Sequence, residues 1–67
     1  MQVYRLLTGA DDADFCHKVT QALSEGWELH GSPTLSVDLS DKVICGQAVV
    51  KDAGDVKYHP AKKLTDY

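Results

Sequence analysis

Cysteine and histidine are the residues of this 67-residue sequence that could act as nucleophiles, general bases or metal ligands. Cys16 and His17 are adjacent on a predicted helix, where neighbouring side chains point about 100° apart and do not converge on one ion. His30 and His59 lie far away in the sequence. No Cys-x-x-Cys or His-x-x-x-His spacing of a zinc site occurs. We therefore expect neither a metal nor a cofactor.

The two cysteines are expected to be packing residues with free thiols. A reactive thiol needs an electropositive, partly exposed setting. Cys45 instead lies in an apolar segment, and Cys16 follows the apolar Phe15. An enzyme that acts through Cys45 or His30 is the least favoured alternative, so the sequence predicts no catalytic residue.

Three aspartates, Asp11, Asp12 and Asp14, resemble a paired-carboxylate site but also suit the start of a helix, where negative charge complements the helix dipole. Asp11 is the expected N-cap. The apolar residues that follow share one helical face: Phe15, Val19, Ala22 and Leu23. Gly26 is expected to end the helix in a left-handed conformation. The pattern predicts a helix over residues 11–26.

Three segments have the composition of β-strands, namely residues 2–8, 27–39 and 43–51. The second alternates apolar and polar residues, which is typical of a half-buried strand. Gly31 and Pro33 interrupt it and favour a sheet edge or a bulge at that point. The third segment is the most apolar, so we expect it to be the central strand.

These elements predict an α+β fold with the order β-α-β-β. A right-handed crossover makes the first two strands parallel, and the third fits between them, which gives the sheet order 1-3-2 with the helix on one face. Residues 1–52 would form the compact domain, and residues 53–67 a polar, mobile tail. The alternative for the tail is a short helix over residues 60–66 that docks Leu64 or Tyr67.

One helix covers only one face of a three-stranded sheet. Because Arg5 is charged, we expect Tyr4 and Leu6 to face the helix. The helix side of the third strand would then present Ile44, Gly46, Ala48 and Val50. The uncovered face would carry Val3, Leu7, Val43, Cys45, Gln47 and Val49. An exposed apolar patch usually marks an interface, so we expect a homodimer through the sheet face or edge. The alternative is a monomer with a cavity or partner site there.

Three polar residues, Arg5, His30 and Gln47, are expected on that same uncovered face. Polar groups buried among apolar ones must be hydrogen-bonded. They could form a polar seam that fixes the register of a dimer. Alternatively, they could line a pocket for a small molecule or peptide, with His30 as its pH-sensitive member.

The net charge of −3 and the pI near 5.4 argue against nucleic acid as a partner. No apolar run approaches the roughly 18 residues of a membrane span, and the N-terminal residues lack the apolar core of a signal peptide. We expect a cytoplasmic, non-enzymatic interaction or accessory module whose partners are itself or an unknown protein, and neither nucleic acid nor membrane.

Several short motifs of the chain recur together in a known family. They are Thr8-Gly9 before the helix, Gly26-Trp27-Glu28-Leu29, Gly31-Ser32-Pro33, and Gly46-Gln47-Ala48-Val49-Val50. With these motifs, residues 3–51 resemble the domain-of-unknown-function family DUF1737 of very small bacterial and phage proteins. The resemblance implies a compact α+β domain. The family has no established activity, so no catalytic residue carries over.

Overall fold

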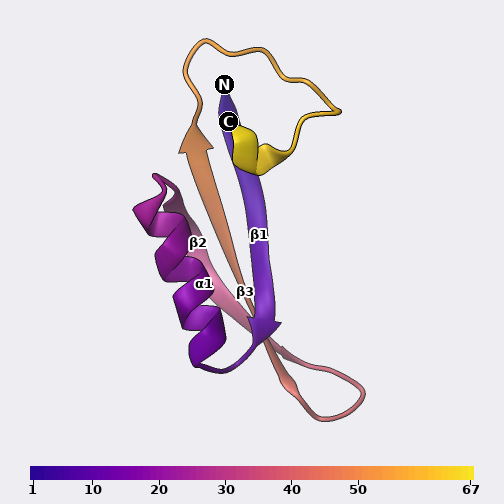
Figure 1. Ribbon diagram of the computed structural model, residues 1–67. Helices are drawn as coiled ribbons and strands as arrows, with labels where there is room; N and C mark the ends of the chain where they lie inside the picture. Colours follow the sequence, from indigo (N-terminus) through magenta and orange to yellow (C-terminus); the bar gives the residue numbers. More distant parts are fainter.

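The computed structural model describes residues 1–67. Its elements are β1 (Gln2–Ala10), α1 (Ala13–Ser24), β2 (Glu28–Val37), β3 (Val43–Asp52) and η1 (Leu64–Asp66), a single turn of 3₁₀ helix (Figure 1). The predicted order of strand, helix, strand and strand is confirmed.

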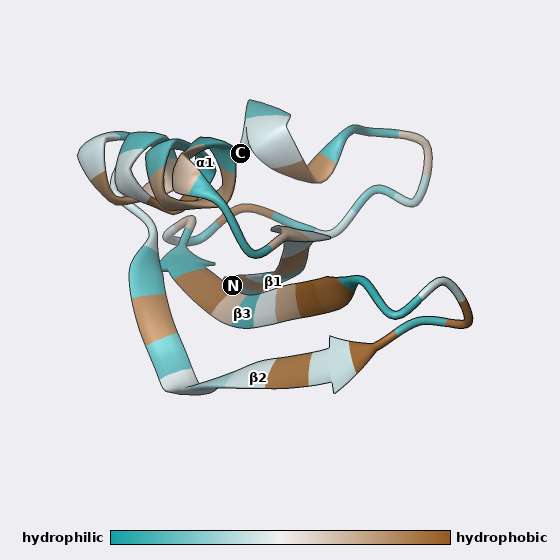
Figure 2. Cartoon of the chain, turned by 90° about the horizontal axis from the view of Figure 1, so that it is seen from below, coloured by the Kyte–Doolittle hydropathy of each residue, from teal (hydrophilic) through white to brown (hydrophobic).

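The three strands form one sheet in the order β1-β3-β2, as the sequence predicts. The central strand β3 is antiparallel to both neighbours, so β1 and β2 run parallel to each other. Figure 2 shows α1 and the C-terminal turn on the same side of the sheet. The opposite face of the sheet has no element over it.

The N-terminal cap of α1 is Asp12, so the expectation that Asp11 caps the helix is wrong by one residue. The Asp12 carboxylate accepts a hydrogen bond from the backbone N–H of Phe15 at 3.1 Å. Asp11 is held outside the helix because its own N–H donates to the carbonyl of Val43 at 3.2 Å. This bond ties the end of β1 to the start of β3.

Gly26 ends α1, as predicted, with a φ of +96° that favours glycine. Its N–H donates to the carbonyl of Leu23 at 3.3 Å, and the N–H of Trp27 donates to the carbonyl of Ala22 at 3.1 Å. This pair of bonds is a Schellman motif. It turns the chain so that Trp27 is buried at the start of β2.

The core lies between α1 and the sheet and consists of Val3, Leu7, Ala22, Trp27 and Val49. Phe15 and Val19 pack against it, whereas Leu23 is exposed at the margin of the helical face. The expectation that Tyr4 and Leu6 face the helix is therefore wrong.

Arg5 accounts for this reversal of the faces. Its guanidinium lies over the ring of Trp27, 5.1 Å from the ring centroid. A cation is attracted to an indole face, and the arginine stem can pass along apolar surface while its head stays near water. Arg5 therefore sits on the helix side of β1, together with Val3 and Leu7.

The middle of β2 bulges, as Gly31 and Pro33 predict. The pairing with β3 jumps from His30 opposite Ala48 to Thr34 opposite Gly46. Gly31 has a φ of +75° within the bulge. Pro33 thus falls on an edge strand, where a missing backbone donor is tolerated.

Within residues 53–67 the structure has only the turn η1 (Leu64–Asp66) rather than a helix over residues 60–66, and beyond Ala53 the segment contacts the core through its last residue. Tyr67 packs against the core after the short turn η1. Its hydroxyl accepts a hydrogen bond from the backbone N–H of His59 at 2.9 Å. The Lys51 ammonium donates to the carbonyl of Tyr67 at 3.1 Å.

Candidate functional site

The face of the sheet opposite α1 carries a cluster of apolar side chains. Successive side chains of a strand point to opposite faces, so the neighbours of the buried Val3, Leu7 and Val49 point away from the helix. Five apolar side chains on this side are here named the open-face cluster: Tyr4, Leu6, Ile44, Ala48 and Val50. Tyr4 and Leu6 are 53% and 55% exposed.

Most of the open-face cluster is contiguous. Tyr4 lies opposite Val50, and Leu6 lies opposite Ala48. On β2, Glu28 and His30 continue the same two rows on the same face. An apolar centre with charged and polar groups at its rim is the usual anatomy of a protein interface.

Gly46 leaves a shallow place on the open face between Ile44 and Ala48. A Cβ atom on Gly46 would lie 2.8 Å from the Oγ1 atom of Thr34, which is too close for two non-bonded atoms. The Thr34 hydroxyl instead donates to the carbonyl of Gly46 at 3.4 Å. The absence of a side chain at this position therefore allows β2 and β3 to pair closely after the bulge.

Seven of the eight residues predicted to lie on the uncovered face are found on the helix side of the sheet. They are Val3, Arg5, Leu7, Val43, Cys45, Gln47 and Val49. Only His30 lies on the open face, opposite Ala48. The predicted placement is wrong for these seven because it assigned Arg5 to the side away from the core.

Arg5, His30 and Gln47 do not form one pocket. Arg5 and Gln47 line two separate clefts on the helix side, while His30 is exposed on the other face. The structure therefore does not bring the three residues together as a shared ligand site.

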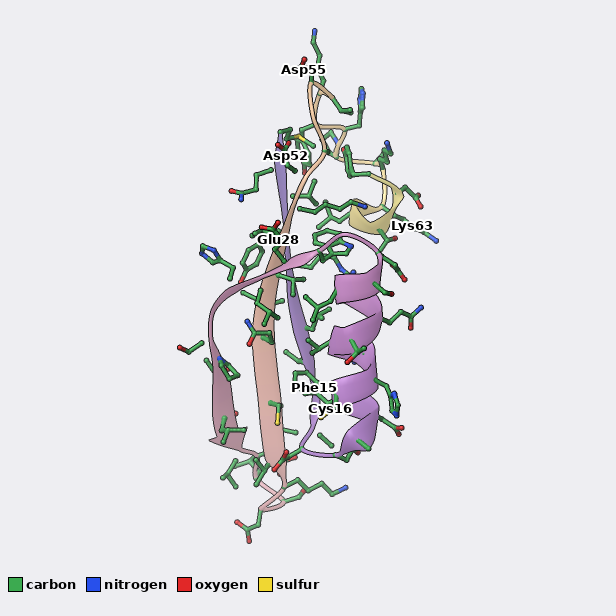
Figure 3. All side chains as sticks on the ribbon, turned by 90° about the vertical axis from the view of Figure 1, so that its left-hand side faces the viewer. Phe15, Cys16, Glu28, Asp52, Asp55 and Lys63 are labelled. Carbon is green, nitrogen blue, oxygen red and sulfur yellow. The ribbon has the colours of Figure 1, made fainter.

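Gln47 contributes to the lining of an apolar cleft of about 300 Å³ between α1 and β2. The cleft is lined by Phe15, Cys16, Val19, Thr20, Leu29, Pro33 and Gln47. Figure 3 shows Phe15 projecting from α1 toward the sheet. The Gln47 amide donates to the carbonyl of Gly31 at 3.3 Å and to that of Ala48 at 2.9 Å. Gln47 thus holds the backbone of the β2 bulge.

Arg5 lines a second, more polar cleft of about 230 Å³, here named the Arg5 cleft. Its lining comes from β1, α1 and the C-terminal turn, and consists of Arg5, Lys18, Gln21, Ala22, Glu25 and Thr65. The Lys51 ammonium approaches the same indole as Arg5, at 5.7 Å from the ring centroid. Trp27 is therefore flanked by two cations.

The two cysteines are free thiols in different environments. Cys16 is exposed and Cys45 is buried. Burial raises the pKa of the Cys45 thiol above its ordinary value of 9.0, and the nearby Asp11 carboxylate raises it further. The Cys45 setting therefore disfavours the thiolate, which is the nucleophilic form.

Histidine, cysteine and acidic side chains do not gather in any group of three that could hold a metal ion. None of the helices combines the length and the hydrophobicity needed to cross a membrane.

The sequence reasoning missed two features of these surfaces. It assigned the open-face cluster to the core, and it did not associate Lys18 and Lys51 with Arg5. Trp27 was the available signal for the second feature, because an indole next to a helix end can accept cations on its face.

The fold and the uncovered sheet face together define a small α+β domain with one helix on a three-stranded sheet. The chain belongs to the family described as Domain of unknown function (DUF1737), whose model matches residues 1–52. The resemblance noted in the sequence is thereby confirmed. The match ends at the last residue of β3, so η1 and Tyr67 lie beyond it. Comparisons with curated proteins and with solved structures found no match.

Proposed function

We propose that this protein is a cytoplasmic, non-enzymatic interaction module that forms a homodimer through the open-face cluster. The observation that carries this proposal is the uncovered apolar face of the sheet, with Tyr4 and Leu6 more than half exposed. Burial of apolar area is the main favourable term in protein association. A twofold dimer would place the same cluster of each copy against the other.

The shape of the open face favours a protein partner over a small molecule. Small-molecule sites are concave, but both clefts of this protein lie on the helix side of the sheet. The net charge of −3 disfavours nucleic acid, whose binding requires positive surface. A second copy of the chain supplies the flat apolar surface that this face requires.

Sedimentation equilibrium with Leu6→Lys tests the face directly. Burying a leucine side chain contributes about 1.5–3 kcal/mol, and in a twofold dimer each substitution acts twice. We therefore expect Leu6→Lys to weaken dimerisation about a hundredfold or more.

Leu29→Lys is the matched control, because Leu29 is 54% exposed but lies on the helix side of β2. It should leave the dimer dissociation constant within about threefold of the wild type. A strictly monomeric wild-type protein at high micromolar concentration would overturn the proposal.

A dimer that survives Leu6→Lys would also contradict the proposed face. The free edge of β1 would then be the remaining contact, because it has no proline or bulge, unlike β2 with Pro33. Pairing along that edge leaves the Leu6 side chain exposed, so the substitution would have little effect on it.

A further inference from the structure

Arg5 has a guanidinium without any polar partner in the protein. None of the side-chain hydrogen bonds involves it. The one ion pair of the chain joins the Met1 ammonium to Asp52 at 3.8 Å. The Trp27 ring holds one face of the guanidinium, which leaves the in-plane N–H groups free to donate into the Arg5 cleft.

Lys18 brings a second positive charge to the Arg5 cleft. Its ammonium donates to the carbonyl of Thr8 at 2.8 Å, which holds it in place and leaves two N–H groups. Gln21 and Thr65 add an amide and a hydroxyl to the lining, and Glu25 is its one carboxylate. The lining therefore carries two positive charges and one negative charge.

We propose that the Arg5 cleft binds a phosphate group, as inorganic phosphate or as a phosphate ester. A guanidinium can donate two parallel hydrogen bonds to two oxygens of a phosphate, and a lysine ammonium adds a compact charge beside it. A phosphate dianion matches two cations better than a carboxylate with its single charge. The proposal is independent of dimerisation, because the cleft and the open-face cluster lie on opposite sides of the sheet.

An NMR titration of the whole chain tests this site, with sodium phosphate in one arm and glycerol phosphate in another. Sodium chloride at equal ionic strength is the reference. We expect the Arg5 side-chain Nε–H and the amides of Lys18, Gln21 and Thr65 to shift together and to saturate. Saturation in either arm supports the site, and the tighter arm identifies the free anion or the ester. Shifts that do not saturate, or that chloride reproduces, would overturn it.

Substitutions of the lining residues distinguish specific binding in the Arg5 cleft from non-specific electrostatic attraction of phosphate to the protein. Arg5→Lys keeps the charge over Trp27 but loses the fork of donors, so we expect phosphate to bind about tenfold more weakly. Lys18→Gln should also weaken binding, whereas Glu25→Gln should strengthen it because it removes the repelling carboxylate. Lys57→Gln makes the same charge change outside the cleft and should have no effect. An equal loss in Lys57→Gln and Lys18→Gln would contradict the proposal.

Discussion

Trp27 determines how two cations are placed at the core side of the sheet. The Arg5 guanidinium and the Lys51 ammonium lie 5.1 Å and 5.7 Å from the centroid of its ring. Such contacts contribute about 0.5–1 kcal/mol at exposed sites and more where water is excluded. A charged residue with this support does not have to point away from the core, which allows Val3 and Leu7 to be buried beside Arg5.

Cys45 provides a prediction about stability and pH. The pKa of its thiol is raised in the folded protein, chiefly by burial, whereas the unfolded chain ionises near 9.0. As the pH rises above 9.0, the unfolded state loses its proton first, so the free energy of unfolding should fall until the folded thiol ionises as well. Urea denaturation across this alkaline range measures the effect.

Cys45→Ser is the control for this pH dependence, because a serine hydroxyl does not ionise in that range. As the pH rises, the free energy of unfolding of the wild type should therefore fall relative to that of Cys45→Ser. A constant difference across the range would show that Cys45 does not contribute.

Among the secondary-structure elements, the pairing of β2 with β3 depends on the absence of a side chain at Gly46. A Cβ atom at this position would meet Thr34 Oγ1 at 2.8 Å, and Thr34 is a stiff β-branched residue. We expect Gly46→Ala to destabilise the protein by about 1–3 kcal/mol, as overpacked positions do. Thermal denaturation measures this cost.

Removing the Thr34 side chain should restore much of the stability. The double variant Gly46→Ala/Thr34→Ala is expected to be more stable than Gly46→Ala alone, because the clashing oxygen is gone. If the stability losses of Gly46→Ala and Thr34→Ala instead add up in the double variant, the cost of Gly46→Ala does not come from a clash with Thr34.

The elements and their order could be predicted from the sequence, because their signals are local. Gly26 ends α1, and Gly31 with Pro33 marks the bulge on an edge strand, as expected. The assignment of the faces could not be predicted in the same way. Both faces of the predicted strand over residues 2–8 carry two apolar residues, so alternation alone does not decide which face is buried. The deciding contact joins Arg5 to Trp27, which is remote in the sequence.

The candidate site was predictable only in kind. A single helix over three strands implies one uncovered face, and the structure has one. Which residues lie on that face depends on which face of β1 is buried. Because this choice was wrong, residues of the open-face cluster were predicted in the core and core residues were predicted on the open face. His30 kept its expected place because β2 was assigned independently of Arg5.

The whole molecule is more extended than a compact domain of its size. It measures 43 × 23 × 18 Å, and its radius of gyration is 13.5 Å, compared with about 11 Å for a compact chain of this length. It exposes 4978 Å², compared with about 4,200 Å² for a compact protein of this mass. The excess of about 800 Å² is similar to the area that each partner buries in a standard interface.

Tyr67 attaches the C-terminal segment, residues 53–67, to the rest of the molecule. Tyr67 packs on the core, whereas Tyr58 is 61% exposed on the same segment. We expect Tyr67→Ala to release residues 54–67 and to speed their cleavage by a protease, because beyond Ala53 it is Tyr67 that packs against the core. Tyr58→Ala is the matched control and should leave the cleavage rate unchanged. Equal rates in both variants and the wild type would contradict docking through Tyr67.

Contacts between copies of the chain test the central claim most directly. In a mixture of isotope-labelled and unlabelled protein, filtered NOE spectra detect only pairs of protons on different copies. We predict such NOEs among the methyl groups of Leu6, Ala48 and Val50 and the ring of Tyr4. Their absence at a concentration where the protein sediments as a dimer would contradict an interface through the open-face cluster.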